Sequence, residues 1–128
     1  MNLKGIPSQR QMRFGEVIRS IISESLIRGD FFNKEIEASM ITVSFVKMSK
    51  DLRVASVYVM PLGGKNKVQM LQFLNDNKNI FQKFISQAKL RSKFTPKINF
   101  YIDDSFDEAE KIENLLLDQK VLRDLNNE

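Results

Sequence analysis

The sequence contains no cysteine and no histidine. Without cysteine there are no disulfides, no thiolate nucleophile and no sulfur-ligated metal. Without histidine, the commonest general base, the Ser-His and Cys-His pairs and the usual zinc and iron ligands are missing. These absences count against an enzyme and against a metalloprotein, and we expect no cofactor.

Long apolar runs are also missing. No stretch of the chain approaches the roughly 20 apolar residues that a membrane-spanning helix needs. Residues 1–16 turn polar too early for a signal peptide. We therefore expect a soluble, cytoplasmic protein with no membrane partner. The 128 residues fit one domain, and the 42% of hydrophobic residues, including ten Phe, can build a core.

Charge is unevenly distributed along the chain. Residues 98–128 hold three basic and nine acidic residues, net −6, which leaves residues 1–97 with 17 basic and seven acidic residues, net +10. A basic body with an acidic tail indicates a polyanionic partner for the body. Any single lysine is more simply a solvated surface charge, but an excess of this size favours nucleic acid.

A first helix is well marked. Ser8 and Gln11 have the spacing of a capping box, and Gly29 with Asp30 ends the helical pattern. The apolar positions between them recur at helical spacing: Phe14, Val17, Ile18, Ile21, Ile22 and Leu26. Arg10, Arg13 and Arg19 fall mainly off this apolar stripe.

Residues 41–60 predict a hairpin with a polar turn at Ser49, Lys50 and Asp51. In its first strand Ile41, Val43 and Phe45 alternate with polar residues and are expected to share one buried face. In its second strand the expected inward residues are Ala55, Val57 and Val59, with Ser56 and Tyr58 on the other side. Pro61 cannot donate a ladder hydrogen bond, so the second strand should stop there.

Helical spacing resumes at Val68, Met70, Leu71 and Leu74, and again at Phe81, Phe84, Ile85 and Ala88. The polar residues 75–79 between these segments predict two helices joined by a tight kink, in which Asn would adopt the left-handed conformation. A third strand follows Pro96, with Ile98, Phe100 and Ile102 alternating with Asn99 and Tyr101. Ser105 and Glu108 then make a second capping box, before a last helix with Ile112, Leu115 and Leu116. The predicted order is α-β-β-α-α-β with a terminal helix.

Asp103 and Asp104 are the strongest candidates for catalysis or metal binding, because paired carboxylates can do both. The plainer interpretation is that they border the last helix, where negative charge suits the helix dipole. With no His in the chain, we favour that interpretation and predict no catalytic residue and no metal ligand.

The basic residues recur near structural edges, where they suit phosphate contacts. Arg10 and Arg13 lie on the first helix, and Lys47, Lys50 and Arg53 surround the hairpin turn. Lys83, Lys89, Arg91 and Lys93 are expected on the helix after the kink. Lys78 lies at the kink itself. We predict RNA contacts from all of these residues: Arg10, Arg13, Lys47, Lys50, Arg53, Lys78, Lys83, Lys89, Arg91 and Lys93.

Two segments, SKDLRVASVYVMPL and FISQAKLRSKFTPKINFYIDDSFDEAEKIENLL, resemble ribosome-binding factor A. The matching residues of the second segment are Leu90, Arg91, Pro96, Phe100, Asp103, Ser105, Ile112 and Leu115. The first helix, with Arg10 and Arg13 near its start, is also similar. The resemblance covers residues 8–116, and the ordered pattern is more specific than any one motif in it.

The resemblance implies an α+β, type II KH-like fold with a three-stranded sheet, in which residues 1–117 form the RNA-binding domain and residues 118–128 a polar tail. It implies a non-enzymatic, monomeric assembly factor that binds the small ribosomal subunit and its ribosomal RNA during late maturation, with links to ribosomal RNA processing and cold adaptation. The chain lacks both the G-x-x-G loop of ordinary KH domains and the Ala-x-Gly kink of this family. Matching Phe81 to the aromatic residue after the family's kink puts the kink at Lys78, Asn79 and Ile80.

Two other functions stay open at this point. One is a protein-interaction module of α+β fold without direct RNA contact, using the acidic tail or an exposed strand edge. The other is an enzyme that uses Asp103 and Asp104. Salt-dependent RNA binding favours the maturation factor, because each phosphate contact steepens the dependence of affinity on salt. Binding to a protein partner that does not depend on salt favours the protein-interaction module. A metal requirement favours the enzyme.

Overall fold

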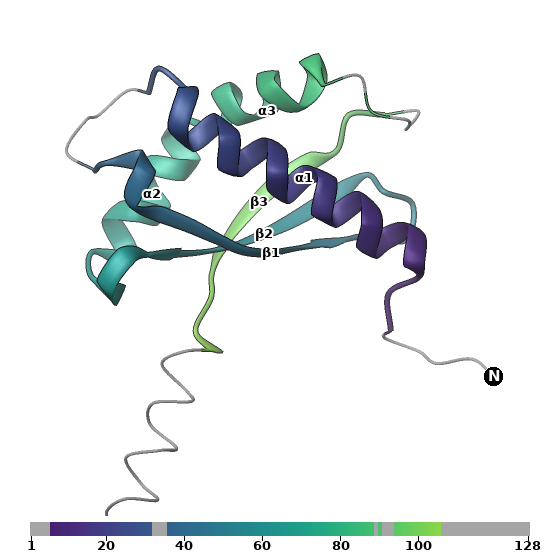
Figure 1. Ribbon diagram of the computed structural model, residues 1–128, viewed down its shortest axis with the longest axis horizontal. Coiled ribbons are helices and arrows are strands. Elements are labelled where there is room, and N and C mark those ends of the chain that lie inside the picture. Colours follow the sequence, from purple (N-terminus) through teal and green to yellow (C-terminus); the bar gives the residue numbers. More distant parts are fainter. Residues whose placement is uncertain (1–5, 32–35, 89, 91–93, 106–128) are drawn as a thin grey trace, which may run out of the picture.

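The computed structural model of the protein describes residues 6–31, 36–88, 90 and 94–105. The main elements follow one another in the predicted order α-β-β-α-α-β (Figure 1). They are α1 (Gln9–Arg28), β1 (Ile41–Met48), β2 (Val54–Pro61), α2 (Lys67–Asp76), α3 (Lys78–Gln87) and β3 (Lys97–Ile102), with short 3-10 turns at Ala38–Met40 and Leu62–Gly64. The predicted terminal helix after Ser105 lies outside the described residues.

Helix α1 begins with the predicted capping box. The Ser8 hydroxyl accepts from the Gln11 backbone N–H at 3.1 Å, and the Gln11 side chain accepts from the Ser8 N–H at 2.8 Å. Two of the orphan N–H donors of the first turn are thereby satisfied. The helix ends at Arg28 with Gly29 as its C-cap, as predicted.

The sheet has the strand order β1-β2-β3. Strands β1 and β2 are antiparallel, whereas β2 and β3 are parallel, with Val57 opposite Phe100 and Tyr58 opposite Tyr101. The inward residues predicted for β2 are all fully buried, and those of β3 are confirmed at Ile98 and Phe100. The parallel pair brings the start of β3 beside the start of β2.

Phe45 corrects the predicted alternation of β1. The register of the β1–β2 pairing shifts between Val43 and Phe45, which marks a bulge. After an extra residue the faces of a strand exchange. Phe45 is therefore 43% exposed, whereas Met48 is buried and Val46 packs against the core.

The hairpin loop is longer than the predicted polar turn, since β1 ends at Met48 and β2 begins at Val54. Leu52 in this loop adopts φ 60° and is buried, so the loop folds back onto the core. As predicted, β2 stops at Pro61, which is its last residue and lies opposite Ile41. A proline is tolerated at that terminal position because few ladder bonds remain to be made. Gly63 and Gly64, at φ 81° and 71°, then turn the chain toward α2.

The kink between the paired helices lies at Asn77, not at Lys78, Asn79 and Ile80. Asn77 has φ −103° and ψ 16°, so the predicted left-handed conformation is also wrong. The residue is buried, and its amide donates a hydrogen bond to the Phe73 carbonyl at 2.9 Å. The side chain thus caps the end of α2 from inside the fold.

The helices lie over one face of the sheet (Figure 1), and the core residues come from these helices and from that face. Helix α1 packs on β1 and beside α3, and α2 packs against β3. Aromatic rings join these layers, with Phe31 and Phe73 centroids 5.3 Å apart and Phe81 and Phe100 centroids 5.2 Å apart. Within the described part of the chain, the other face of the sheet is not covered by a helix.

Candidate nucleic-acid interface

The start of α1 lies beside the end of β1. The Gln11 amide donates to the Met48 carbonyl at 3.1 Å. At Gly15 the helix comes so close to β1 that a Cβ atom would lie 2.6 Å from the Val46 carbonyl oxygen. Arg10 and Arg13, both exposed, are consequently held next to the hairpin.

The hairpin loop carries its cations on a hydrogen-bonded frame. The Asp51 carboxylate accepts from the Ser49 hydroxyl at 2.7 Å and from the Arg53 backbone N–H at 3.1 Å. The Ser49 hydroxyl also accepts from the Val54 N–H at 3.0 Å. The hydrogen bond from Ser49, followed by that from Arg53, holds the pKa of Asp51 below its usual value. Lys50 and Arg53 thus project from a loop with defined geometry.

Strand β3 adds a further cation at this end of the sheet. The Lys97 backbone N–H donates to the Arg53 carbonyl at 2.8 Å. The Arg53 guanidinium lies 4.5 Å from the centroid of the Phe94 ring, in a cation–π contact. The start of α1, the hairpin loop and the start of β3 thus lie at one end of the molecule (Figure 1). We call this end the hairpin end, and its basic residues are Arg10, Arg13, Lys47, Lys50, Arg53 and Lys97.

Sequence reasoning missed Lys97. Lys97 joins the hairpin end because β2 and β3 pair in parallel, which sets Lys97 opposite Val54. The residues alone predicted the hairpin pairing of the first two strands but not the partner of the third strand.

Two arginines of α1 away from the hairpin end have carboxylate partners. Arg19 pairs with Glu16 at 3.0 Å, and Arg28 pairs with Glu24 at 3.1 Å. Within the hairpin end, Arg53 approaches Asp51 at 3.8 Å. Within the described residues, Arg10, Arg13, Lys47 and Lys50 form no ion pair. The hairpin end therefore carries positive charge that is largely uncompensated, as a phosphate-binding surface requires.

The other predicted contact residues are not gathered there. The Lys78 ammonium donates to the Asn99 side-chain oxygen at 3.1 Å, which ties the start of α3 to β3. Lys83 is exposed on α3, and no contact in the described part of the chain joins it to the hairpin end. Lys89, Arg91 and Lys93 were predicted on the helix after the kink; α3 ends at Gln87, and these three lie outside the described residues.

A second feature lies on the open face of the sheet. Phe45, Tyr58 and Tyr101 stand in one row across β1, β2 and β3. The Phe45 and Tyr58 rings stack at 4.3 Å, and the Tyr58 and Tyr101 rings at 5.4 Å. The sequence placed Tyr58 and Tyr101 on outward positions, but it assigned Phe45 to the core because it gave no sign of the bulge. We call this set the aromatic row.

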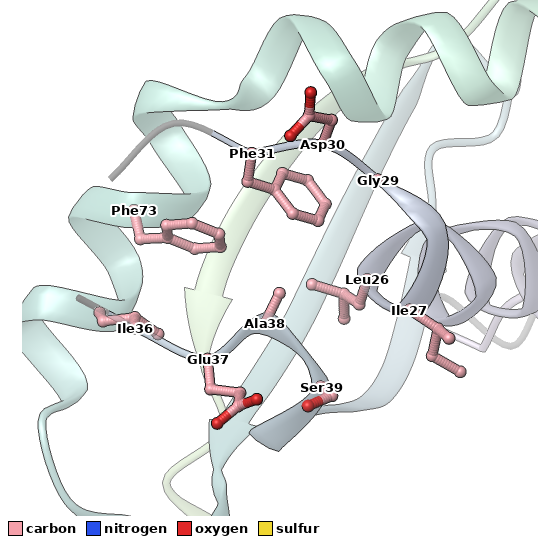
Figure 2. A pocket seen from close by; sticks show the side chains of 10 residues that line it. All are labelled: Leu26, Ile27, Gly29, Asp30, Phe31, Ile36, Glu37, Ala38, Ser39 and Phe73. Carbon is pink, nitrogen blue, oxygen red and sulfur yellow. The ribbon is translucent and has the colours of Figure 1, made fainter. Parts of the chain in front are cut away.

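A cavity lies at the opposite end of α1, between its last turn, the chain before β1 and α2. Figure 2 shows Asp30 and Glu37 on opposite sides of it, with Phe31 and Phe73 between them. Residues 32–35, which join Phe31 to Ile36, lie outside the described residues. The acidic side chains at this cavity disfavour a phosphate, so the basic hairpin end is the better candidate for a polyanion.

Asp103 and Asp104 have separate structural partners. Asp103 accepts from the Ser105 backbone N–H at 3.0 Å and from its hydroxyl at 2.6 Å. Asp104 approaches the Lys67 ammonium at 4.0 Å. Among the described residues no three acidic side chains lie where they could hold a metal ion together. Every helix in the described segments is too short or too polar to cross a membrane.

Comparison with known proteins finds one matching family and similar relatives. The family model of ribosome-binding factor A matches residues 10–116. Ribosome-binding factor A of Ruegeria sp. (strain TM1040) is 45% identical over 119 residues, covering 93% of this chain and 90% of that protein.

Structures of related proteins share the fold. A Thermotoga maritima protein solved by solution NMR has 31% identity and a TM-score of 0.63, covering 76% of this chain and 90% of that one. A homology model of the Thermus thermophilus factor, fitted into a cryo-EM map of its 30S complex, has 18% identity and a TM-score of 0.57, covering 73% of this chain and 96% of that one. The last likeness concerns the fold alone; on the family match and the sequence identity, the chain belongs to the ribosome-binding factor A family.

Proposed function

We propose that this protein is an assembly factor that binds the small ribosomal subunit and its ribosomal RNA during late maturation, in the cytoplasm and as a monomer. Family membership makes the ribosome the partner class, because relatives bear the name ribosome-binding factor A. The same name denotes a binding factor and not a catalyst, which removes the support for an enzyme that uses Asp103 and Asp104.

The observation that carries the RNA contact is the hairpin end. Its cations come from α1, the end of β1, the hairpin loop and β3. Within the described residues, Arg10, Arg13, Lys47 and Lys50 have no carboxylate partner. Phosphates are contacted by such side chains without reading of the base sequence. A basic surface of this kind complements the negatively charged backbone of folded ribosomal RNA. It complements an average protein surface, which carries mixed charge, less well.

The choice of the small subunit rests on a relative. The Thermus thermophilus factor has been fitted into a cryo-EM map of its complex with the 30S subunit. We extend that partner to this chain. Late maturation, ribosomal RNA processing and cold adaptation follow from the family resemblance and complete the proposal.

The extent of the interface is part of the proposal. We take residues 1–117 as the RNA-binding domain and residues 118–128 as a polar tail. Lys78, beside the kink, and Lys83 on α3 extend the basic surface, and Lys89, Arg91 and Lys93 remain predicted contacts outside the described residues. The hairpin end is the part that the described contacts support best.

Sedimentation with purified subunits tests this function. We expect the protein to travel with small subunits and not with large ones, and to bind protein-free small-subunit ribosomal RNA. Binding to both subunits equally, or to neither, would refute the proposal. Binding to intact small subunits without any affinity for their free RNA would favour the protein-interaction module instead.

A matched pair of variants sharpens the test. Arg10→Gln with Lys50→Gln removes two charges from the hairpin end, whereas Arg28→Gln with Lys65→Gln removes the same charge from exposed positions elsewhere. We expect the first variant to lose sedimentation at a salt concentration at which the second still sediments. Circular dichroism of both variants checks that the fold is intact.

A further inference from the structure

The open face of the sheet has an organised pattern across its strands. Phe45 is opposite Tyr58, and Tyr58 is opposite Tyr101, which makes the aromatic row. The next row toward the hairpin end contains Lys47, Ser56 and Asn99 in the same two pairings. Apolar ring surface thus borders a polar, basic strip.

The rings leave flat surface free at both ends of the row. Tyr58 is half-buried between its two neighbours, to which it is stacked with interplanar angles of 16° and 29°. Phe45 and Tyr101 stand on the two edge strands and are 43% and 44% exposed. A further flat ring can therefore extend the stack beyond Phe45 or beyond Tyr101.

Cations lie next to both ends. Lys47 is two residues from Phe45 and exposed on the same face. Asn99 is two residues from Tyr101 and holds the Lys78 ammonium at 3.1 Å. Two residues along a strand span about 6.6 Å. At the Phe45 end an ammonium group thus lies one side chain away along the strand, and at the Tyr101 end Asn99 holds one.

A carboxylate lies on the other side of the row. Asp103, which follows β3, is hydrogen bonded to Ser105 and Ser44. The face is therefore acidic on one side of the rings and basic on the side of the hairpin end. A ligand with flat rings and an anionic backbone fits this polarity, with its anions toward Lys47 and Lys78.

We infer that the aromatic row binds unpaired RNA bases, which stack on Phe45 and on Tyr101 while their phosphates face Lys47 and Lys78. The inference deepens the proposed function and rests on it, because it assigns single-stranded RNA to one face of an RNA-binding protein. Duplex RNA is excluded from this face because its bases already stack on one another. Phosphate contacts at the hairpin end and base contacts on the row are separate parts of one surface.

The chain offers a direct optical probe of the row. It has two tyrosines, both in the aromatic row, and no tryptophan. Intrinsic tyrosine fluorescence therefore reports on the row alone, and stacked bases quench it. We expect a short oligouridine to quench this fluorescence as it binds, and an RNA duplex to bind without comparable quenching.

Substitutions separate the rings from the charges. Phe45→Leu with Tyr101→Leu keeps apolar side chains but removes the outer rings, and should weaken oligouridine binding about fivefold or more without changing duplex binding. Phe45→Tyr and Tyr101→Phe keep the rings and should bind like the unaltered protein. Val68→Ala, which alters a side chain exposed on α2, controls for loss of surface apolar area.

The outcomes distinguish this inference from the proposed function. The inference is overturned if the leucine variant folds and binds oligouridine normally and the unaltered protein shows no quenching. The proposed function would still stand in that case if Arg10→Gln with Lys50→Gln weakened RNA binding. If the unaltered protein binds no RNA of either kind, both fail. If the leucine variant loses subunit binding yet binds oligouridine normally, the row contacts protein, and the inference is again overturned.

Discussion

Asp103 accepts hydrogen bonds from the backbone N–H and the hydroxyl of Ser105, at 3.0 and 2.6 Å. These bonds stabilise the charged form of the carboxyl group. The Ser105 hydroxyl, and after it the Ser44 hydroxyl, lowers the pKa of Asp103 from its ordinary value of 3.8. A carboxylate committed in this way orients the chain after β3 and is poorly placed to act as a general base.

The lowered pKa predicts an effect on stability at acid pH. Because the carboxyl binds protons more weakly in the folded state, its contribution is present above the unfolded-state pKa and is lost as pH falls through the folded-state pKa. We expect Asp103→Asn to lower thermal stability at neutral pH and the difference from the unaltered protein to shrink below about pH 4. Melting curves across this range measure the difference. A difference that stays constant with pH would refute this role, and Asp104→Asn is the neighbouring control.

At the scale of elements, the bulge in β1 decides which residues face the helices. The Val46 carbonyl oxygen lies where a Cβ atom on Gly15 of α1 would approach to 2.6 Å, so α1 and β1 meet closely at this point. The bulge turns Val46 and Met48 inward and leaves Phe45 on the open face. Without it, strict alternation would bury Phe45 and expose Val46.

Two lysine substitutions test this assignment. We expect Val46→Lys to destabilise the fold by about 2 kcal/mol or more, because it places an ammonium group between β1 and α1. Phe45→Lys should cost about 0.2–1 kcal/mol, the value of one cross-strand pair. Urea denaturation of both variants gives the two free energies of unfolding. The reverse order of stability would mean that β1 alternates without a bulge.

Local signals in the sequence predicted the elements, and long-range contacts decided the rest. The capping box of Ser8 and Gln11 lies within one helical turn, so it was readable from the sequence and is confirmed. The bulge at Phe45 depends on how β1 pairs with β2. The kink at Asn77 depends on burial of its amide against the Phe73 carbonyl. Neither of these has a signature that a single sequence displays.

At the scale of the whole molecule, the candidate site is an assembly of distant segments. Basic residues near position 10, in the hairpin and at the start of β3 meet because α1 lies on β1 and β3 pairs with β2. The sequence identified most of these residues by type and supplied the overall charge asymmetry. The sequence could not show that Lys78 lies outside the group of cations at the hairpin end. Its hydrogen bond to Asn99 forms only in the folded chain.

The dependence of small-subunit affinity on salt tests the central claim, that the hairpin end contacts ribosomal RNA phosphates. The logarithm of the binding constant should fall linearly with the logarithm of salt concentration for the unaltered protein. For Arg10→Gln with Lys50→Gln we predict a slope shallower by about 0.7–0.9 for each phosphate that the variant no longer neutralises. Arg28→Gln with Lys65→Gln should keep the original slope. Equal slopes for the two folded double variants would contradict the claim and move the RNA surface away from the hairpin end.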